Sequence, residues 1–210
     1  VLAEGRRKEF IVLHMYGSHF NYRERYPREA AFFKPDDATE AKAANRLSLV
    51  NAYDNSIRFT DRFLHDIMTE VGKTGATAAL IYTSDHGENI FDDDRRLFLH
   101  ASPTPSYYEL HVPFIVWTSA AYRREFAPVA QALAANSGKL MSPSASAFHT
   151  MLGLAGITSP VRNDSLSVAS TLFAVRPCLY LTDHNSPVPL RKMLRSGNDF
   201  KMFKKKGIGL

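Results

Sequence analysis

Short apolar runs recur along this chain and predict buried β-strands. The runs are rich in aliphatic and β-branched side chains, which is typical of parallel strands covered on both faces. They occupy residues 10–13, 76–83, 112–117 and 178–182. Residues 199–206 are expected to add an edge strand, because the consecutive lysines at 204–206 would protect an exposed edge from further pairing.

Apolar residues at three- and four-residue steps predict a long helix over residues 40–71, which Gly72 and Gly75 would end. Its apolar face would consist of Leu47, Val50, Tyr53, Ile57, Leu64, Ile67 and Met68. A second helix is expected over residues 145–154, after a proline at position 143 that suits a first turn. Strands that alternate with helices predict an α/β fold, in the form of a three-layer α/β/α sandwich with a largely parallel sheet.

The composition of the chain suits one large domain. Its 210 residues are 45% hydrophobic and 11% aromatic, so residues 1–210 are expected to form a single α/β domain. The net charge of +5 favours an anionic partner such as a phosphate or a lipid headgroup. Nucleic acid is not expected, because basic and aromatic residues do not interleave. No apolar stretch approaches the length of a membrane span.

The single cysteine, Cys178, excludes an intramolecular disulfide within this chain. It lies in the last of the four apolar runs, so we expect a buried small hydrophobic side chain rather than a nucleophile.

The segment SDHGE at residues 84–88 directly follows the apolar run 76–83. Ligands of open α/β sheets bind at the carboxyl ends of the strands. Aspartate oxygen and histidine nitrogen are natural zinc ligands. Gly87 is expected to allow a sharp turn, so that Asp85, His86 and Glu88 converge. The sequence therefore predicts a metal site at the end of this strand.

Two more histidines follow apolar residues. His14 ends the run 10–13, and His100 follows Phe98 and Leu99. The alternative for each is an ordinary loop histidine. Asp85 and His86 could instead cap a helix or bind one another, and Glu88 could belong to a solvated loop. His19 is expected to fix its own loop through a hydrogen bond. The other histidines, expected to be structural or at the surface, are His65, His111, His149 and His184.

Several segments together resemble a known family. HMYGSH at residues 14–19, followed by RYP at 25–27, resembles a motif of bacterial phosphoethanolamine transferases that modify lipid A. The segments that follow in the order of that family are NAYDNSI at 51–57, SDHGE at 84–88, LH at 99–100, VPFIVW at 112–117 and FHTMLGL at 148–154. The resemblance covers residues 14–181, with Ala101 in place of the family's usual glycine. The Asp-His-Gly element alone is shared with sulfatases and other alkaline-phosphatase-like enzymes.

The resemblance implies an alkaline-phosphatase-like fold and zinc-dependent transfer of phosphoethanolamine from a phospholipid donor to lipid A or a related glycolipid. Asp85 and His86 would be ligands of the catalytic zinc. His14 and His100 would bind a second zinc or the substrate phosphate. Glu88 would lie near the amine of phosphoethanolamine or near the second metal. The full-length protein would act at the periplasmic face of the bacterial inner membrane, anchored by preceding helices.

The family's threonine nucleophile and an acidic zinc ligand precede the Gly-Ser-His motif, and this chain has no threonine before His14. We therefore expect an N-terminally truncated part of a larger periplasmic catalytic domain, without its catalytic nucleophile and inactive alone. Ser18 and Ser84 lack a partnered base and are not expected to replace it. The alternatives are a sulfatase or phosphodiesterase of the same superfamily, or a non-catalytic headgroup-binding module.

Overall fold

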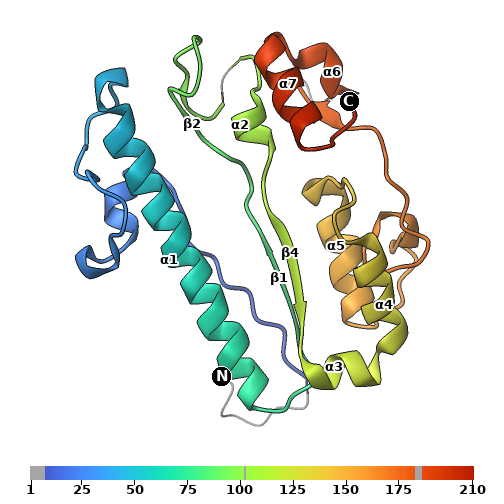
Figure 1. Ribbon diagram of the computed structural model, residues 1–210. Coiled ribbons are helices and arrows are strands. Elements are labelled where there is room, and N and C mark those ends of the chain that lie inside the picture. The colour runs from blue at the N-terminus through green and yellow to red at the C-terminus, as the bar shows by residue number, and fades with distance from the viewer. Residues whose placement is uncertain (1–7, 102, 183–185) are drawn as a thin grey trace. The chain divides into compact units, whose positions relative to one another are not determined.

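The computed structural model describes residues 8–101, 103–182 and 186–210, which group into two compact units (Figure 1). The first unit runs to Thr74 and includes Ile90–Leu99, and the second comprises Gly75–Asn89 and His100–Leu210. Among the described residues, none of the helices combines the length and the apolarity that a transmembrane span requires.

The first unit is built around the long helix α1 (Arg46–Lys73), which confirms the predicted helix, although α1 begins at Arg46 rather than at residue 40 and includes Gly72. Three 3-10 turns precede it, η1 (Tyr22–Arg25), η2 (Arg28–Ala30) and η3 (Ala43–Asn45). The predicted apolar face is only partly correct, because Leu47 and Ile57 are 64% and 45% exposed. The residues that α1 buries recur at helical spacing and include small and polar side chains: Ser48, Leu49, Ala52, Asn55, Ser56, Thr60 and Leu64.

The polar residues of this buried face hold the preceding loop. Oδ1 of Asn55 accepts hydrogen bonds from the backbone N–H groups of Phe32 and Phe33, at 2.9 Å each. Nδ2 of Asn55 donates to the carbonyl oxygen of Phe33 at 2.9 Å, and the Ser48 hydroxyl accepts from Ala38 N–H at 2.9 Å. Backbone groups that are partly withdrawn from water need such partners, which explains why polar residues replace apolar ones on this face.

The apolar run at residues 10–13 does not form the predicted strand. Phe10 and Val12 are 73% and 72% exposed. A strand is stabilised only when a neighbour takes up its backbone hydrogen bonds. None of the strand pairs in the described part of the chain includes this run. The sequence pattern identified an extended apolar segment but could not supply its partner.

The second unit contains a two-stranded sheet of β1 (Ala79–Thr83) and β4 (Phe114–Thr118). The strands are antiparallel, with Ile81 opposite Val116, so the prediction of parallel strands is wrong for this pair. A parallel connection needs a crossover of a dozen or more residues, usually a long helix. The helix between these strands is α2 (Tyr107–Leu110), which is too short for that role.

Three helices cover one face of this sheet, as Figure 1 shows for α4 and α5. They are α3 (Ala120–Glu125), α4 (Ala127–Asn136) and α5 (Pro143–Leu154). The side chains that join them to the strands are Ile81, Val116, Tyr122, Val129, Leu133, Leu154 and Ala169. The strand residues on one face of the sheet pack on these helices. The α/β class is therefore confirmed.

The remaining elements of the second unit follow η4 (Asp164–Leu166). Strands β5 (Leu179–Leu181) and β6 (Pro187–Pro189) are antiparallel, and α6 (Leu190–Met193) and α7 (Gly197–Lys205) complete the chain. The predicted edge strand over residues 199–206 is thus wrong. Asp199 and Phe203 are both buried while Lys201 between them is exposed, which matches the period of a helix, since a strand would place all three on one face.

The C-terminal elements pack on α2 through a cluster that includes Tyr107, Leu190, Leu194 and Phe203. Cys178 packs against the same cluster, and burial raises the pKa of its thiol. Both facts agree with the prediction that this cysteine is a small hydrophobic side chain and not a nucleophile.

Candidate metal centre

The side chains of His86, Glu88 and His100 converge just beyond the end of β1, within the second unit. Each offers one ligand atom, and these atoms all lie within 4.8 Å of one another. Nδ1 of His100 lies 3.0 Å from Oε1 of Glu88, and Nδ1 of His86 lies 3.8 Å from the same oxygen. The two imidazole ring centroids are 3.6 Å apart. Two histidines therefore share one carboxylate.

The backbone after β1 positions these side chains through local hydrogen bonds. The Ser84 hydroxyl donates to the carbonyl oxygen of His86 at 2.7 Å, and Oδ1 of Asp85 accepts from His86 N–H at 3.0 Å. Nδ1 of His86 lies 2.9 Å from the carbonyl oxygen of Gly87. A proton on Nδ1 would make this hydrogen bond and leave the lone pair of Nε2 for a metal, as is usual for histidine ligands.

Gly87 is needed here for a different reason from the one predicted. Its φ angle is not positive, so Gly87 makes no left-handed turn. Its N–H donates to the carbonyl oxygen of Glu109 at 2.7 Å, and a Cβ at this position would clash with the carbonyl oxygen of Tyr108. The glycine allows two backbone segments to approach closely, which holds the strand end against α2.

Glu88 is buried, with 5% of its side chain exposed, and its neighbour Asn89 anchors it. Nδ2 of Asn89 donates to Oε1 of Glu109 at 2.6 Å, and the Ser106 hydroxyl donates to Oδ1 of Asn89 at 2.6 Å. Ser106 also caps α2 by accepting from Glu109 N–H at 3.2 Å. These hydrogen bonds fix the residue that directly follows Glu88, and so limit the positions that the Glu88 carboxylate can take as a ligand or a hydrogen-bond acceptor.

Sequence reasoning missed these supporting residues. Ser106 and Glu109 have the Ser-x-x-Glu spacing of a helix N-terminus, which was a detectable signal. The usual partner of such a glutamate is the capping residue itself. Here its side chain instead binds Asn89, which the tertiary structure alone reveals.

Asp85 lies beside this group of three but outside it. Its side chain is 88% exposed, and Oδ2 lies 3.8 Å from Nε2 of His86. Burial, and to a smaller extent the Asp85 carboxylate, raise the pKa of the neighbouring Tyr82. His14 is exposed and belongs to the first unit. Metal binding by Asp85 and by His14 therefore stays a prediction.

The other residues considered from the sequence have ordinary structural contacts. Nδ1 of His19 lies 2.6 Å from the carbonyl oxygen of Phe20, as expected for a loop-fixing histidine. The Ser18 hydroxyl accepts a hydrogen bond from Ser56 at 2.8 Å. His184 lies outside the described residues.

The donor set of the group fits zinc. Imidazole nitrogens and carboxylate oxygens are both ligand types that zinc takes in proteins. Zinc–ligand bonds of about 2.1 Å place tetrahedral ligands about 3.4 Å apart. The ligand atoms here, within 4.8 Å of one another, are close enough for small side-chain rotations to reach that geometry.

Comparison with known proteins agrees with this chemistry. A family model described as Sulfatase matches residues 1–157. A Kdo(2)-lipid A phosphoethanolamine 7''-transferase of Escherichia coli (strain K12) is 33% identical over 158 residues, which cover 73% of this chain and 27% of that protein. The chain therefore spans about a quarter of the length of this curated relative.

Solved structures of phosphoethanolamine transferases also resemble this chain. The integral membrane lipooligosaccharide phosphoethanolamine transferase A (EptA) of Neisseria meningitidis matches with a TM-score of 0.66 and 29% identity, over 72% of this chain and 29% of that one. The C-terminal periplasmic domain of EptC from Escherichia coli, in complex with Zn, matches with a TM-score of 0.71 over 87% of this chain and 51% of that one. At 22% identity, the second likeness concerns the fold alone. By its family match and its fold, this chain belongs to the sulfatase family.

Proposed function

We propose that this chain is the zinc-binding part of a phosphoethanolamine transferase, which moves phosphoethanolamine from a phospholipid donor to lipid A or a related glycolipid. The observation that carries the proposal is the convergence of His86, Glu88 and His100 in a sulfatase-family chain. A relative that is 33% identical is named a Kdo(2)-lipid A phosphoethanolamine transferase, which supports the substrate class.

Asp85 and His86 would hold the catalytic zinc. The 3.8 Å between Oδ2 of Asp85 and Nε2 of His86 supports this pairing, because it is close to the spacing of two ligands on one zinc ion. When bound, zinc supplies a Lewis acid for phosphate oxygens and lowers the pKa of a coordinated hydroxyl.

His100 and Glu88 would act on the substrate or on a second zinc. The buried Glu88 carboxylate beside Nδ1 of His100 orients the ring and leaves Nε2 to bind a phosphate oxygen or a metal. The same carboxylate is a suitable partner for the ammonium of phosphoethanolamine. His14 would bind the second zinc or the substrate phosphate, as the resemblance to the family implies.

A threonine nucleophile and an acidic zinc ligand would come from a segment preceding this chain, in the order seen in the family. Residues 1–210 would then be one part of a larger catalytic domain with an α/β/α sandwich and a largely parallel sheet. That domain would act at the periplasmic face of the inner membrane. By itself the chain would not transfer phosphoethanolamine, because no residue in it would form the covalent intermediate.

The test uses the full-length protein with a fluorescent phosphatidylethanolamine donor, a lipid A acceptor and added zinc. His86→Ala should abolish transfer by removing a zinc ligand, and His100→Ala should lower turnover while one zinc stays bound. His65→Ala, on the exposed surface of α1, is the matched control and should leave transfer unchanged. The isolated 210-residue chain should be inactive.

The same assay separates the alternatives. Headgroup release to water without labelling of lipid A would indicate a phosphodiesterase. Headgroup binding without turnover in the full-length protein would indicate a binding module. Full transfer activity after His86→Ala would contradict the proposal.

A further inference from the structure

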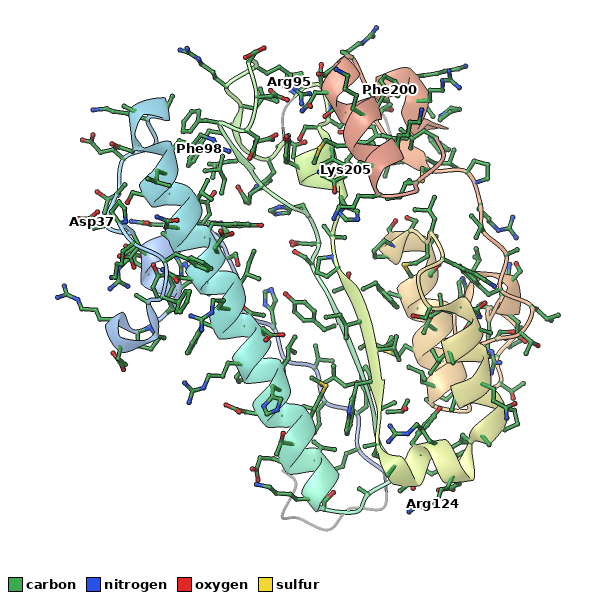
Figure 2. The ribbon with its side chains drawn as sticks, viewed as in Figure 1. Asp37, Arg95, Phe98, Arg124, Phe200 and Lys205 are labelled. Atoms are coloured by element: carbon green, nitrogen blue, oxygen red, sulfur yellow. The ribbon has the colours of Figure 1, made fainter. Side chains whose placement is uncertain are left out.

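The C-terminal helices of the second unit carry a dense set of cations. We define the basic C-terminal surface as the exposed residues Arg191, Lys192, Arg195, Lys201, Lys204, Lys205 and Lys206. It lies beyond residues 1–157, where the family model matches. Figure 2 marks Lys205 and Phe200 on α7, at the end of this unit where α6 and α7 lie side by side. The surface is therefore a feature of this chain outside the matched domain.

Helix α7 separates its cations from its buried side. Asp199 and Phe203, four residues apart, are buried, at 0% and 4% exposure. Lys201, Lys204 and Lys205 are exposed, and the helical period places them on the opposite side of the helix. The packing of one side thus fixes which way the lysines point.

No nearby carboxylate neutralises this charge among the described residues. Asp199 is the only acidic residue in 186–210, and its Oδ1 accepts a hydrogen bond from the backbone N–H of Tyr107 at 2.9 Å. None of the ion pairs between described residues includes a cation of the basic C-terminal surface. Unpaired positive charges of this density attract anionic partners.

We propose that the basic C-terminal surface binds the anionic phospholipid surface of a bilayer. Lysine is a compact, strongly hydrated charge that suits headgroup phosphates, and five of the seven residues are lysines. Single-stranded nucleic acid would require exposed aromatic side chains for stacking. The aromatic residues of α7, Phe200 and Phe203, instead pack in the cluster around Tyr107. This inference does not depend on the proposed function.

Hydrogen bonds link this surface to the metal centre. Asp199 on α7 binds the backbone of Tyr107 in α2. The neighbouring Ser106 binds Asn89, which directly follows Glu88. All of these residues belong to the second unit. A bilayer held at the basic C-terminal surface would therefore be held at a defined orientation to the metal centre.

The experiment measures binding of the 210-residue chain to sedimenting vesicles. One set of vesicles contains phosphatidylcholine alone. In the other set, about a quarter of the lipid is the anionic phosphatidylglycerol. We expect binding to the anionic vesicles only, with strong weakening by added salt. Each lysine near an anionic surface contributes about a fivefold gain in binding. A triple variant should therefore bind the anionic vesicles on the order of 100-fold more weakly. It carries Lys201→Gln, Lys204→Gln and Lys205→Gln.

The matched control removes three exposed cations elsewhere, by Lys42→Gln, Lys73→Gln and Arg124→Gln. It should weaken binding far less, because it changes the net charge equally but leaves the surface intact. Circular dichroism verifies that both variants fold. Equal loss in the two variants would overturn the proposal in favour of a net-charge effect. Binding to phosphatidylcholine alone, or tighter binding to duplex or single-stranded nucleic acid than to anionic vesicles, would also overturn it.

Discussion

Oε1 of Glu88 lies 3.0 Å from Nδ1 of His100, although twelve positions separate the two residues in the sequence. The chain between them begins with β2 (Asn89–Ile90) and ends with β3 (Phe98–Leu99), and these short strands pair. Phe91 N–H donates to the carbonyl oxygen of Leu97 at 2.8 Å within the same hairpin. The paired strands thus bring a carboxylate and an imidazole together immediately beyond their ends.

Replacing Glu88 by Gln should weaken zinc binding by at least about tenfold. The amide keeps the size of the side chain but removes the negative charge shared by two imidazoles. A competition titration against a chromophoric chelator measures the affinity. Glu70→Gln, at an exposed position of α1, is the control and should leave the affinity unchanged. Equal affinities for wild type and Glu88→Gln would remove this residue from the metal centre.

Replacing Gly87 by Ala should lower the free energy of unfolding by roughly 1–3 kcal/mol. The new Cβ would meet the backbone of Tyr108, which cannot rotate away as a side chain could. Gly72→Ala is the control and should not lower the free energy of unfolding. Gly72 lies in α1 with open space around it, and alanine favours a helix. Urea denaturation measures both variants. A Gly87→Ala variant as stable as the wild type would contradict the close approach of the two backbone segments.

Replacing Asn55 by Ala should cost about 3 kcal/mol of stability. The change removes the buried side-chain oxygen that accepts hydrogen bonds from the partly buried N–H groups of Phe32 and Phe33. Asn51→Ala, on the same helix, removes a single exposed hydrogen bond to the carbonyl oxygen of Pro35 and should cost under about 1 kcal/mol. Similar losses in the two variants would contradict the role assigned to Asn55.

Protonation of His111 should contribute to loss of stability below about pH 6.5. Burial, together with the positive charge of Lys206, lowers the pKa of His111 in the folded chain. The unfolded chain therefore binds a proton at a higher pH than the folded chain, and acid favours unfolding. The hydroxyl of Tyr107, 3.0 Å from Nδ1 of His111, supports the neutral ring.

The measurement compares urea unfolding at pH 7.5 and pH 5.5 in wild type and His111→Gln. The wild type should lose more stability than the variant over this interval. His65→Gln keeps His111 and should behave as the wild type. The same pH dependence in wild type and His111→Gln would rule out this contribution.

The sequence by itself determined the features that depend on neighbouring residues. The helical spacing of apolar residues before Gly72 predicted α1, and the apolar run before residues 84–88 predicted the strand that ends at the metal centre. The order of the short motifs indicated the family, which the match over residues 1–157 confirms. These signals are local because each arises from the period of one helix or strand, or from the spacing within one motif.

Tertiary structure decided everything that requires two distant segments. Apolar residues 10–13 lack a partner strand within the described residues. Gly197–Lys205 form a helix that buries Asp199 and Phe203 against α2 and the cluster around it. The Glu109 carboxylate accepts a hydrogen bond from Asn89, twenty positions away in the sequence. Such contacts depend on which surfaces become buried together, and burial is a property of the assembled chain rather than of any short window of sequence.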